Sequence, residues 1–382
     1  MKRILLAVAI LAILAVCMTF TAPMSHLRNY LKWGVHTIHD YRTHPVRGIP
    51  AARKPEPWPY DSLYNRVGLS DSMQRRIDAY DTHAFLVIRN GRLFFERYWD
   101  GYDSLRLSGS FSAAKSIISL LVGIAVDEGR IGSLEDPAGK YLPHFLTEGL
   151  ENVRIKDLLT MSSGTNYDES DKGYFSLNAL SYYGDDLEYM VSKMKRKEEP
   201  GKYWEYRSGD TQVLGLIVEK VFGRSISQLV AERFMGPMGA ERASLWLLDG
   251  DGRREKAFCC FNGVARDYAR FGQLVLNGGT WGGNRIVSEA YVKAAVTPAA
   301  HLKDRKEGDA PVDFYGYQYW IFRHRGVPVY AMNGLFGQYV FVLPEQNAVI
   351  VRLGESAVEK SIHHFQPENF VYVEAALQML GR

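Results

Sequence analysis

The sequence is poor in the features that define several large classes of protein. Its 382 residues contain three cysteines, too few for the disulfide framework of a small secreted domain. The formal net charge is only +3, which gives no basis for binding a nucleic acid. Internal repeats and low-complexity tracts are also missing. We therefore expect an ordinary globular protein, built either as one domain with a large insertion or as two or three compact units.

The cysteines and histidines offer no metal site. Cys17 lies in an N-terminal apolar run, whereas Cys259 and Cys260 are adjacent and are expected to be small buried residues of a strand. None of the ten histidines, including the adjacent His363 and His364, has the spacing of metal ligands. The sequence therefore predicts a protein that uses neither a metal nor a cofactor.

The N-terminus has the pattern of an export signal. Lys2 and Arg3 precede an apolar run that extends to residue 20. The run is short for a full membrane span, and Ala22 followed by Pro23 is a poor cleavage site. Residues 1–22 are predicted to be an uncleaved signal-anchor, with a cleaved signal peptide as the alternative. Either would place the body of the protein outside the cytoplasm, anchored to a membrane and facing the periplasm or cell exterior, or secreted.

Proline and arginine are frequent between residues 43 and 61, so residues 23–69 are predicted to be an extended tether. A hairpin signal follows at residues 83–98, where two apolar runs flank Asn90 and Gly91, a pair that favours a type I′ turn.

Strand signals return near the C-terminus, so strands are expected at both ends of the compact part. Four consecutive antiparallel strands are predicted over residues 317–323, 327–332, 339–343 and 348–353, before an amphipathic helix over 367–380. The stretch between the two groups reads as helix and loop. The pattern predicts an α+β protein: an antiparallel sheet flanked by helices over 70–127 and 261–382, with an all-α lobe inserted over 128–260.

A Ser-Ala-Ala-Lys motif stands at the start of a long apolar helix. Its Ser112 and Lys115 are three residues apart, so they share one helix face with Cβ atoms about 5–6 Å apart. Apolar surroundings lower the basicity of a lysine, which can then take the proton of a serine nucleophile. A second copy, from Ser192 to Lys195, lies in a charge-dense helix end, where its lysine stays solvated and protonated. We therefore predict Ser112 as the nucleophile and Lys115 as its base.

A tyrosine could supply the second proton carrier. Tyr206 precedes an apolar helix predicted over 211–222, with Ser208 or Asp210 as the N-cap residue. The positive end of that helix would favour a phenolate over a phenol, and a phenolate near a lysine is a competent general base.

A glycine motif could supply the oxyanion site. Gly334 and Gly337 stand in a Gly-Leu-Phe-Gly turn that enters a predicted strand. Glycines allow a backbone to come close to a ligand, so backbone N–H groups of this turn could point at a developing oxyanion.

In order and spacing, these motifs resemble those of the penicilloyl-serine transferase superfamily, which contains class C β-lactamases, D-alanyl-D-alanine carboxypeptidases, and related esterases and amidases. Tyr206-Arg207-Ser208 is similar to the Tyr-x-Ser motif of its 6-aminohexanoate-dimer hydrolase branch, and residues 155–164, 265–272 and 334–338 also resemble that branch. The likeness covers roughly residues 75–380. It implies a fold like that of β-lactamases and transpeptidases.

One part of the superfamily pattern is missing. β-Lactamases and transpeptidases carry Lys-Thr-Gly, whose lysine binds the substrate carboxylate, on the strand before the glycine motif. The corresponding segment here, about residues 329–331, is Val-Tyr-Ala. The resemblance therefore implies an exported serine hydrolase of esters or linear amides. A D,D-peptidase or β-lactamase acting on cell-wall peptides or β-lactams is the alternative, and a catalytically silent cell-wall-binding protein is an alternative of another class.

The resemblance also implies a two-step acyl transfer on a small-molecule ester or amide. Ser112 would attack the carbonyl, while Lys115 and Tyr206 would move the protons. The backbone N–H groups of Ser112 and Leu335 would hold the oxyanion, and Ser208 would orient Lys115. The supporting residues implied in this way are Ser208, Gly334 and Gly337.

Overall fold

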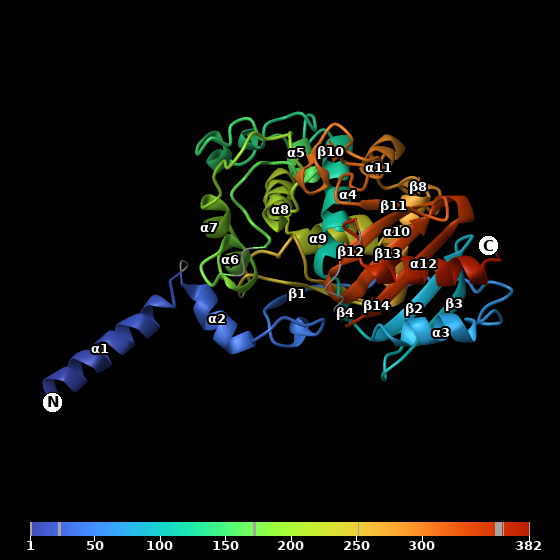
Figure 1. Cartoon of the computed structure of the whole chain (residues 1–382), viewed down its shortest axis with the longest axis horizontal. Coiled ribbons are helices and arrows are strands. Elements are labelled where there is room, and N and C mark those ends of the chain that lie inside the picture. The colour runs from blue at the N-terminus through green and yellow to red at the C-terminus, as the bar shows by residue number, and fades with distance from the viewer. Residues whose placement is uncertain are drawn as a thin grey trace.

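The computed structural model describes residues 2–21, 24–170, 173–250, 252–355, 361 and 363–381. It contains a six-stranded antiparallel sheet in the order β11-β12-β13-β14-β2-β3, on the side opposite helices α6 (Leu177–Tyr183) and α7 (Leu187–Ser192) (Figure 1). The strands are β2 (Thr82–Arg89), β3 (Arg92–Tyr98), β11 (Trp320–His324), β12 (Val327–Gly334), β13 (Gln338–Leu343) and β14 (Ala348–Gly354). Strand β14 pairs with β2, so the two halves of the sequence meet in one sheet, which confirms the predicted α+β architecture.

The hairpin between β2 and β3 forms as predicted. Asn90 and Gly91 both have positive φ, at 52° and 70°, which a type I′ turn requires. Alternate residues of β2 then lie in two different cores: Leu86 and Ile88 in one, Phe85 and Val87 in the other.

Helices cover both faces of the sheet. Helix α10 (Ala265–Leu276) packs on β13 and β14 from the side of the helical lobe, while α12 (Pro367–Met379) and α3 (Asp71–Asp78) cover the opposite face. A Cβ on Gly272 would lie 2.6 Å from Cγ1 of Val349, so a glycine is required where α10 approaches the sheet.

A second sheet lies between the large sheet and the helical lobe. Its strands β1 (Val46–Ile49), β5 (Ser244–Leu247), β6 (Phe261–Gly263) and β4 (Ser108–Gly109) run in the order β1-β5-β6-β4. The lobe also contains the helices α5 (Ile155–Leu159), α6 (Leu177–Tyr183), α7 (Leu187–Ser192), α8 (Ser208–Phe222) and α9 (Ile226–Val230). Because β5 lies within residues 128–260, the prediction of an all-α lobe is wrong. These strands have only two to four residues, too few for an alternating pattern to stand out.

The segment predicted to be a tether is part of the folded body. Helix α2 (Ser25–Trp33) packs against α6, and β1 pairs with β5. Ile38 and Ile49 are fully buried, and Trp58 is nearly so. The prediction of an extended tether is therefore wrong, because scattered apolar residues anchor this segment between its prolines and arginines.

Helix α1 (Lys2–Met18) projects away from the rest of the chain (Figure 1). In the part of the chain that the structure describes, no helix is both long and apolar enough to cross a membrane. Ala22 and Pro23, at the predicted cleavage site, lie outside the described residues. The signal-anchor therefore stays a prediction.

Candidate active site

The Ser-Ala-Ala-Lys motif lies where a short helical turn, η2 (Phe111–Ala113), continues into the buried helix α4 (Ala114–Asp127). Lys115 Nζ donates a hydrogen bond to Ser112 Oγ at 2.9 Å. Ser112 is partly exposed, whereas Lys115 is only 2% exposed. The hydroxyl is thus open to a ligand, while the amine beside it is shielded from water.

Burial lowers the pKa of Lys115 to about 8, against the opposing effect of the Glu169 carboxylate. The amine donates a second hydrogen bond to the carbonyl oxygen of Phe258 at 2.8 Å, and it lies 5.0 Å from the ring centre of Tyr206. A pKa near 8 leaves about a tenth of the lysine neutral at pH 7, and a neutral amine can take the proton of Ser112.

The second copy of the motif makes no such pair. The Ser192 hydroxyl donates to the carbonyl oxygen of Tyr189 at 2.7 Å, and Lys195 lies 3.6 Å from Glu148. Both Ser192 and Lys195 are exposed. In this copy the lysine thus pairs with a carboxylate, and the serine hydroxyl bonds to the backbone.

Tyr206 reaches Ser112 from the loop that precedes α8. Its side chain lies close enough to Ser112 for the serine to lower its pKa slightly, and its ring stacks on Trp320 with centroids 5.6 Å apart. Burial raises the pKa of Tyr206 far above its ordinary value, and Glu169 raises it further. The prediction of a phenolate is therefore wrong, because dense packing outweighs the effect of the helix end. Tyr206 keeps its proton at neutral pH and can relay protons, whereas Lys115 is the group poised to accept one.

Arg207, next to Tyr206, anchors the tyrosine loop. Its guanidinium is fully buried and forms ion pairs with Glu198, at 2.9 Å, and with Glu205. Its backbone N–H donates to the sulfur of Met161 at 3.3 Å. Sequence analysis did not single out this arginine, because acidic residues such as its two partners usually lie on a solvated surface.

Glu169 is a candidate functional residue that sequence analysis did not identify. Its carboxylate accepts hydrogen bonds from the backbone N–H and the hydroxyl of Ser208, at 2.9 and 2.8 Å. The prediction that Ser208 orients Lys115 is therefore wrong, because the Ser208 hydroxyl is bonded to Glu169. The cap prediction is wrong as well: the N-cap residue of α8 is Arg207, with no side-chain cap. Glu169 secures the start of α8 and places a negative charge near Lys115 and Tyr206.

The end of β12 lies against the turn that carries Ser112. A Cβ on Gly334 would overlap the carbonyl oxygen of Ser110 and lie 3.2 Å from the backbone nitrogen of Ala113, so only glycine permits this approach. Leu335 follows directly. The two predicted oxyanion donors, the N–H groups of Ser112 and Leu335, thus belong to neighbouring segments.

The residues that precede Gly334 on β12 include no lysine or arginine. The residues just before Gly334 on β12 are Met332 and Asn333. Neither residue carries a positive charge.

Uncommon backbone conformations gather around the site. Phe111, Cys260 and Phe336 all have positive φ, at 42°, 76° and 60°. Non-glycine residues in this region cost on the order of 1–3 kcal/mol each and persist only where the surroundings fix them. Two of the three flank the predicted oxyanion donors.

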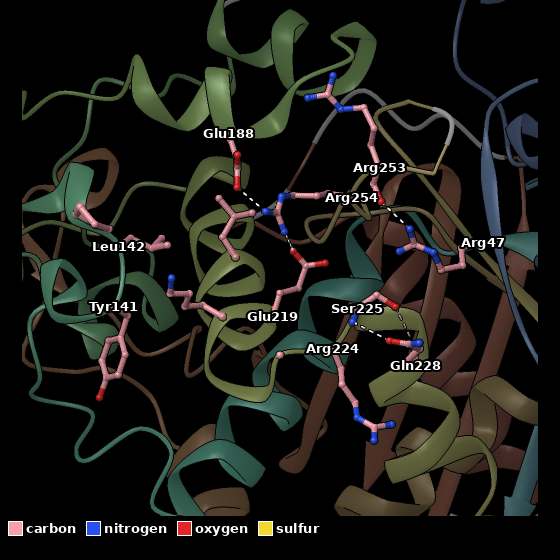
Figure 2. Close-up of a pocket in the computed structure, with 14 residues that line it drawn as sticks. Arg47, Tyr141, Leu142, Glu188, Glu219, Arg224, Ser225, Gln228, Arg253 and Arg254 are labelled. Carbon is pink, nitrogen blue, oxygen red and sulfur yellow. Dashed lines mark hydrogen bonds and ion pairs between the residues drawn. The ribbon is translucent and has the colours of Figure 1, made fainter.

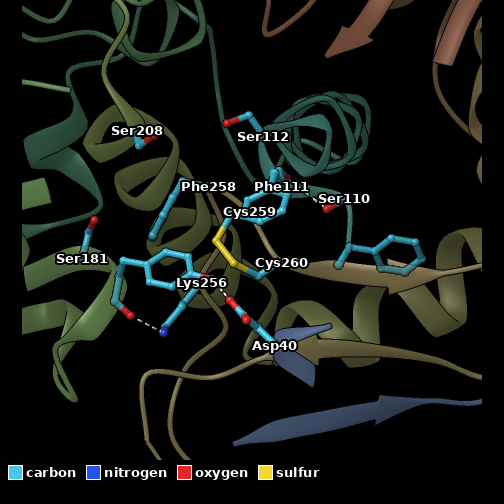
Figure 3. Close-up of a disulfide and its surroundings, with 12 residues drawn as sticks. Asp40, Ser110, Phe111, Ser112, Ser181, Ser208, Lys256, Phe258, Cys259 and Cys260 are labelled. Atoms are coloured by element: carbon cyan, nitrogen blue, oxygen red, sulfur yellow. Dashed lines mark hydrogen bonds between the residues drawn. A yellow bond between two sulfur atoms is a disulfide. The ribbon is translucent and has the colours of Figure 1, made fainter. Parts of the chain in front are cut away.

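Cys259 and Cys260 are joined by a disulfide below the Ser112 turn (Figure 3). They are buried and stand just before β6. The prediction that both cysteines are buried is confirmed, but they precede the strand instead of belonging to it, and they are bonded to each other. The pair follows Phe258, whose carbonyl oxygen accepts the hydrogen bond from Lys115.

A cavity in the helical lobe and a cluster of cation-binding side chains could also hold ligands, but neither includes the residues around Ser112. A cavity of about 580 Å³ opens in the helical lobe (Figure 2). Its walls carry ion pairs, such as those of Arg254 with Glu188 and Glu219. A possible cation site consists of Asp81, His83 and Asp100, whose ligand atoms lie within 4.8 Å of one another at one end of the β2–β3 hairpin.

Comparison with known proteins shows a consistent family likeness. A sequence model of the beta-lactamase family matches residues 73–362. The 6-aminohexanoate-dimer hydrolase of Paenarthrobacter ureafaciens is 26% identical over 309 residues, which cover 77% of this chain and 76% of that protein.

Solved structures share the fold. A protein from Bacillus anthracis, assigned as a 6-aminohexanoate-dimer hydrolase, superposes with a TM-score of 0.76 at 23% identity, covering 92% of this chain and 94% of its own. A family VIII carboxylesterase superposes with a TM-score of 0.66 at 18% identity, covering 84% and 98% of the respective chains.

Proposed function

The chain belongs to the beta-lactamase family and is a serine hydrolase; from this premise we propose that it cleaves an ester or a linear amide through an acyl-enzyme on Ser112. One observation carries the proposal: a buried lysine, with a pKa lowered to about 8, contacts Ser112 Oγ at 2.9 Å. A buried amine of this kind is the activating group that a serine nucleophile needs.

In the proposed mechanism, neutral Lys115 takes the proton of Ser112 as the hydroxyl oxygen attacks the substrate carbonyl. The N–H groups of Ser112 and Leu335 stabilise the oxyanion. Tyr206, which lies beside Ser112 and Lys115, passes the proton to the departing alcohol or amine. Water then attacks the acyl-enzyme and gives up a proton to the same two groups. The bond between the acyl carbon and Ser112 Oγ breaks, the acid leaves, and the proton returns to Ser112.

The lack of a cation on β12 supports an ester or linear amide as the substrate. Met332 and Asn333 precede Gly334, so this strand offers no charge to bind a substrate carboxylate. By analogy with the relative from Paenarthrobacter ureafaciens, we include the 6-aminohexanoate dimer among the candidate substrates. A D,D-peptidase or β-lactamase activity is the alternative, with weaker support from the residues of the site.

The nucleophile can be tested by labelling with a fluorophosphonate and reading the intact mass. We expect one adduct on the wild type and on Ser192→Ala, which removes the serine of the second motif, and none on Ser112→Ala. Labelling of Ser112→Ala at the wild-type rate would refute the assignment. A screen with p-nitrophenyl esters, the 6-aminohexanoate dimer and nitrocefin then separates the substrate classes. If Ser112 is neither labelled nor acylated by any of these, the silent binding protein becomes the better account.

We also propose that the protein is exported. The proposal rests on the basic and apolar N-terminal sequence and on the exposure of the apolar α1 side chains Ile4, Leu5 and Leu6. Fusing residues 1–70 to a reporter that is active only outside the cytoplasm tests it. We expect reporter activity, with loss of that activity when residues 2–18 are deleted; an inactive fusion that is stably expressed would contradict export.

A further inference from the structure

We infer that the Cys259–Cys260 disulfide positions Lys115 for proton transfer, so that the proposed hydrolase works fully only when this pair is oxidised. The inference rests on the proposed function, because it assigns the pair a part in the same reaction. The mechanism derived above does not use the two cysteines.

The contact that carries the inference is the one between Lys115 and Phe258. Nζ of Lys115 donates to two acceptors, Ser112 Oγ at 2.9 Å and the carbonyl oxygen of Phe258 at 2.8 Å. The carbonyl fixes where the amine sits, and so keeps it within reach of the serine. Lys115 is only 2% exposed, so the loss of this acceptor would leave its amine with one hydrogen-bond partner fewer in a buried environment.

The carbonyl in turn depends on the backbone that follows it. Phe258 directly precedes Cys259, and a disulfide between adjacent residues closes a small ring that contains their peptide bond. Cys260 within this ring has a φ of 76°, a left-handed conformation that L residues rarely adopt without restraint. The ring therefore restricts the backbone just beyond the carbonyl that holds Lys115.

The surroundings hold the other end of the segment in place. The backbone N–H of Leu247 and the side chain of Asn262 both donate to the carbonyl oxygen of Cys260, at 3.1 and 2.8 Å. The backbone N–H of Ser110 donates to the carbonyl oxygen of Phe261 at 2.7 Å. Residues 258–261 thus link the lysine to the turn that carries Ser112, and the disulfide lies in the middle of this link (Figure 3).

Reduction would release the restraint. A dithiol, or a phosphine with water, supplies two electrons and two protons; the S–S bond breaks, two thiols form, and the reductant is oxidised to a disulfide or a phosphine oxide. Cys260 can then leave its left-handed conformation, and the Phe258 carbonyl can turn away from Lys115. Two consequences follow for Lys115: its amine is less well placed, and its protonated form loses an acceptor, which lowers its pKa.

The test compares oxidised and reduced enzyme in a Cys17→Ser background, because Cys17 is an exposed free thiol. Reduction by tris(2-carboxyethyl)phosphine is verified by alkylation and intact mass, and kcat and KM are measured against pH with a p-nitrophenyl ester. A Cys259→Ala/Cys260→Ala variant is measured in parallel. If the variant fails to fold, the chemically reduced enzyme still tests the inference. If the reductant cannot reach the buried pair, the variant tests it instead.

We expect kcat on the high-pH plateau to fall by roughly 10- to 100-fold with KM changed by less than about twofold, as for a misplaced catalytic group. The midpoint of the pH profile should move below its oxidised value, which a loss of folded protein alone would not cause. Reoxidation should restore both kcat and the midpoint of the pH profile. The double variant should not respond to the reductant. Verified reduction that leaves kcat and the midpoint unchanged would overturn the inference. Fluorophosphonate labelling of Ser112 in the oxidised enzyme tests the proposed function separately.

Discussion

Replacing Glu169 by glutamine should shift the pH dependence of turnover toward lower pH. The carboxylate favours the protonated form of Lys115, so its removal lowers a lysine pKa that is already reduced to about 8. Since only the neutral amine accepts the proton of Ser112, the acidic limb of the kcat/KM profile follows that pKa. The Glu169→Gln enzyme should therefore retain a larger share of its plateau rate at pH 6 than the wild type does.

The size of the underlying effect follows from the burial of Lys115. An ordinary lysine with a pKa of 10.5 is neutral about once in 3000 molecules at pH 7, whereas a pKa of about 8 makes this about one in ten. Burial thus raises the competent fraction roughly 300-fold, an electrostatic effect of about 3 kcal/mol. At pH 7, any further fall in the pKa of Lys115 can raise its neutral fraction by at most the remaining factor of about ten.

The assay is a set of stopped-flow ester hydrolysis profiles from pH 5 to 10, each normalised to its own plateau. Normalisation matters because Glu169 also bonds Ser208, so the plateau itself can fall. Ser208→Ala is the matched control: it removes the hydroxyl bond but keeps the charge, and its midpoint should stay at the wild-type value. A Glu169→Gln midpoint that is unchanged or higher would refute the assignment of Lys115 as the base.

Three further predictions concern other residues of the site. Tyr206→Phe should lower kcat by about 10²–10⁴-fold while the melting temperature changes little, and near wild-type turnover would remove the proposed proton relay. Gly334→Ala should cost on the order of 10²–10³ in kcat, because its Cβ would overlap the Ser110 carbonyl oxygen and displace the Leu335 N–H; an active, folded variant would argue against that oxyanion site. Burial raises the pKa of Asp210 to about 7, so the wild type should lose stability as pH rises from about 4 to 7. Asp210→Asn, which cannot ionise, should make this loss smaller. Urea unfolding at pH 5 and 8 checks it, and an equal loss in both proteins would contradict it.

The sequence could predict those parts of the fold that depend on local pattern. The β2–β3 hairpin, the four C-terminal strands and α12 all have the expected type and approximate bounds, because turn chemistry and side-chain period are local signals. The pairing of Ser112 with Lys115 is equally local, since it follows from one helical turn.

The features that the sequence could not supply depend on contacts between distant segments. Glu169 bonds Ser208 across 39 positions, and Phe258 receives Lys115 across 143. The pKa of Tyr206 was predicted in the wrong direction for the same reason, since its burial comes from packing against segments far away in sequence. Composition was misleading at the N-terminus, where Ile38 and Ile49 fix a segment that reads as a linker.

The central claim is that a covalent intermediate forms on Ser112, and the most direct measurement is to trap it. The enzyme is mixed with p-nitrophenyl acetate, quenched in acid within milliseconds and digested, and the acetylated peptide is located by mass spectrometry. We predict acetylation of Ser112 at close to one group per active enzyme, formed at the rate of the p-nitrophenol burst, and strongly slowed in Lys115→Ala. Turnover without any acyl group on Ser112, or an acyl group on another residue that forms at the burst rate, would contradict the account.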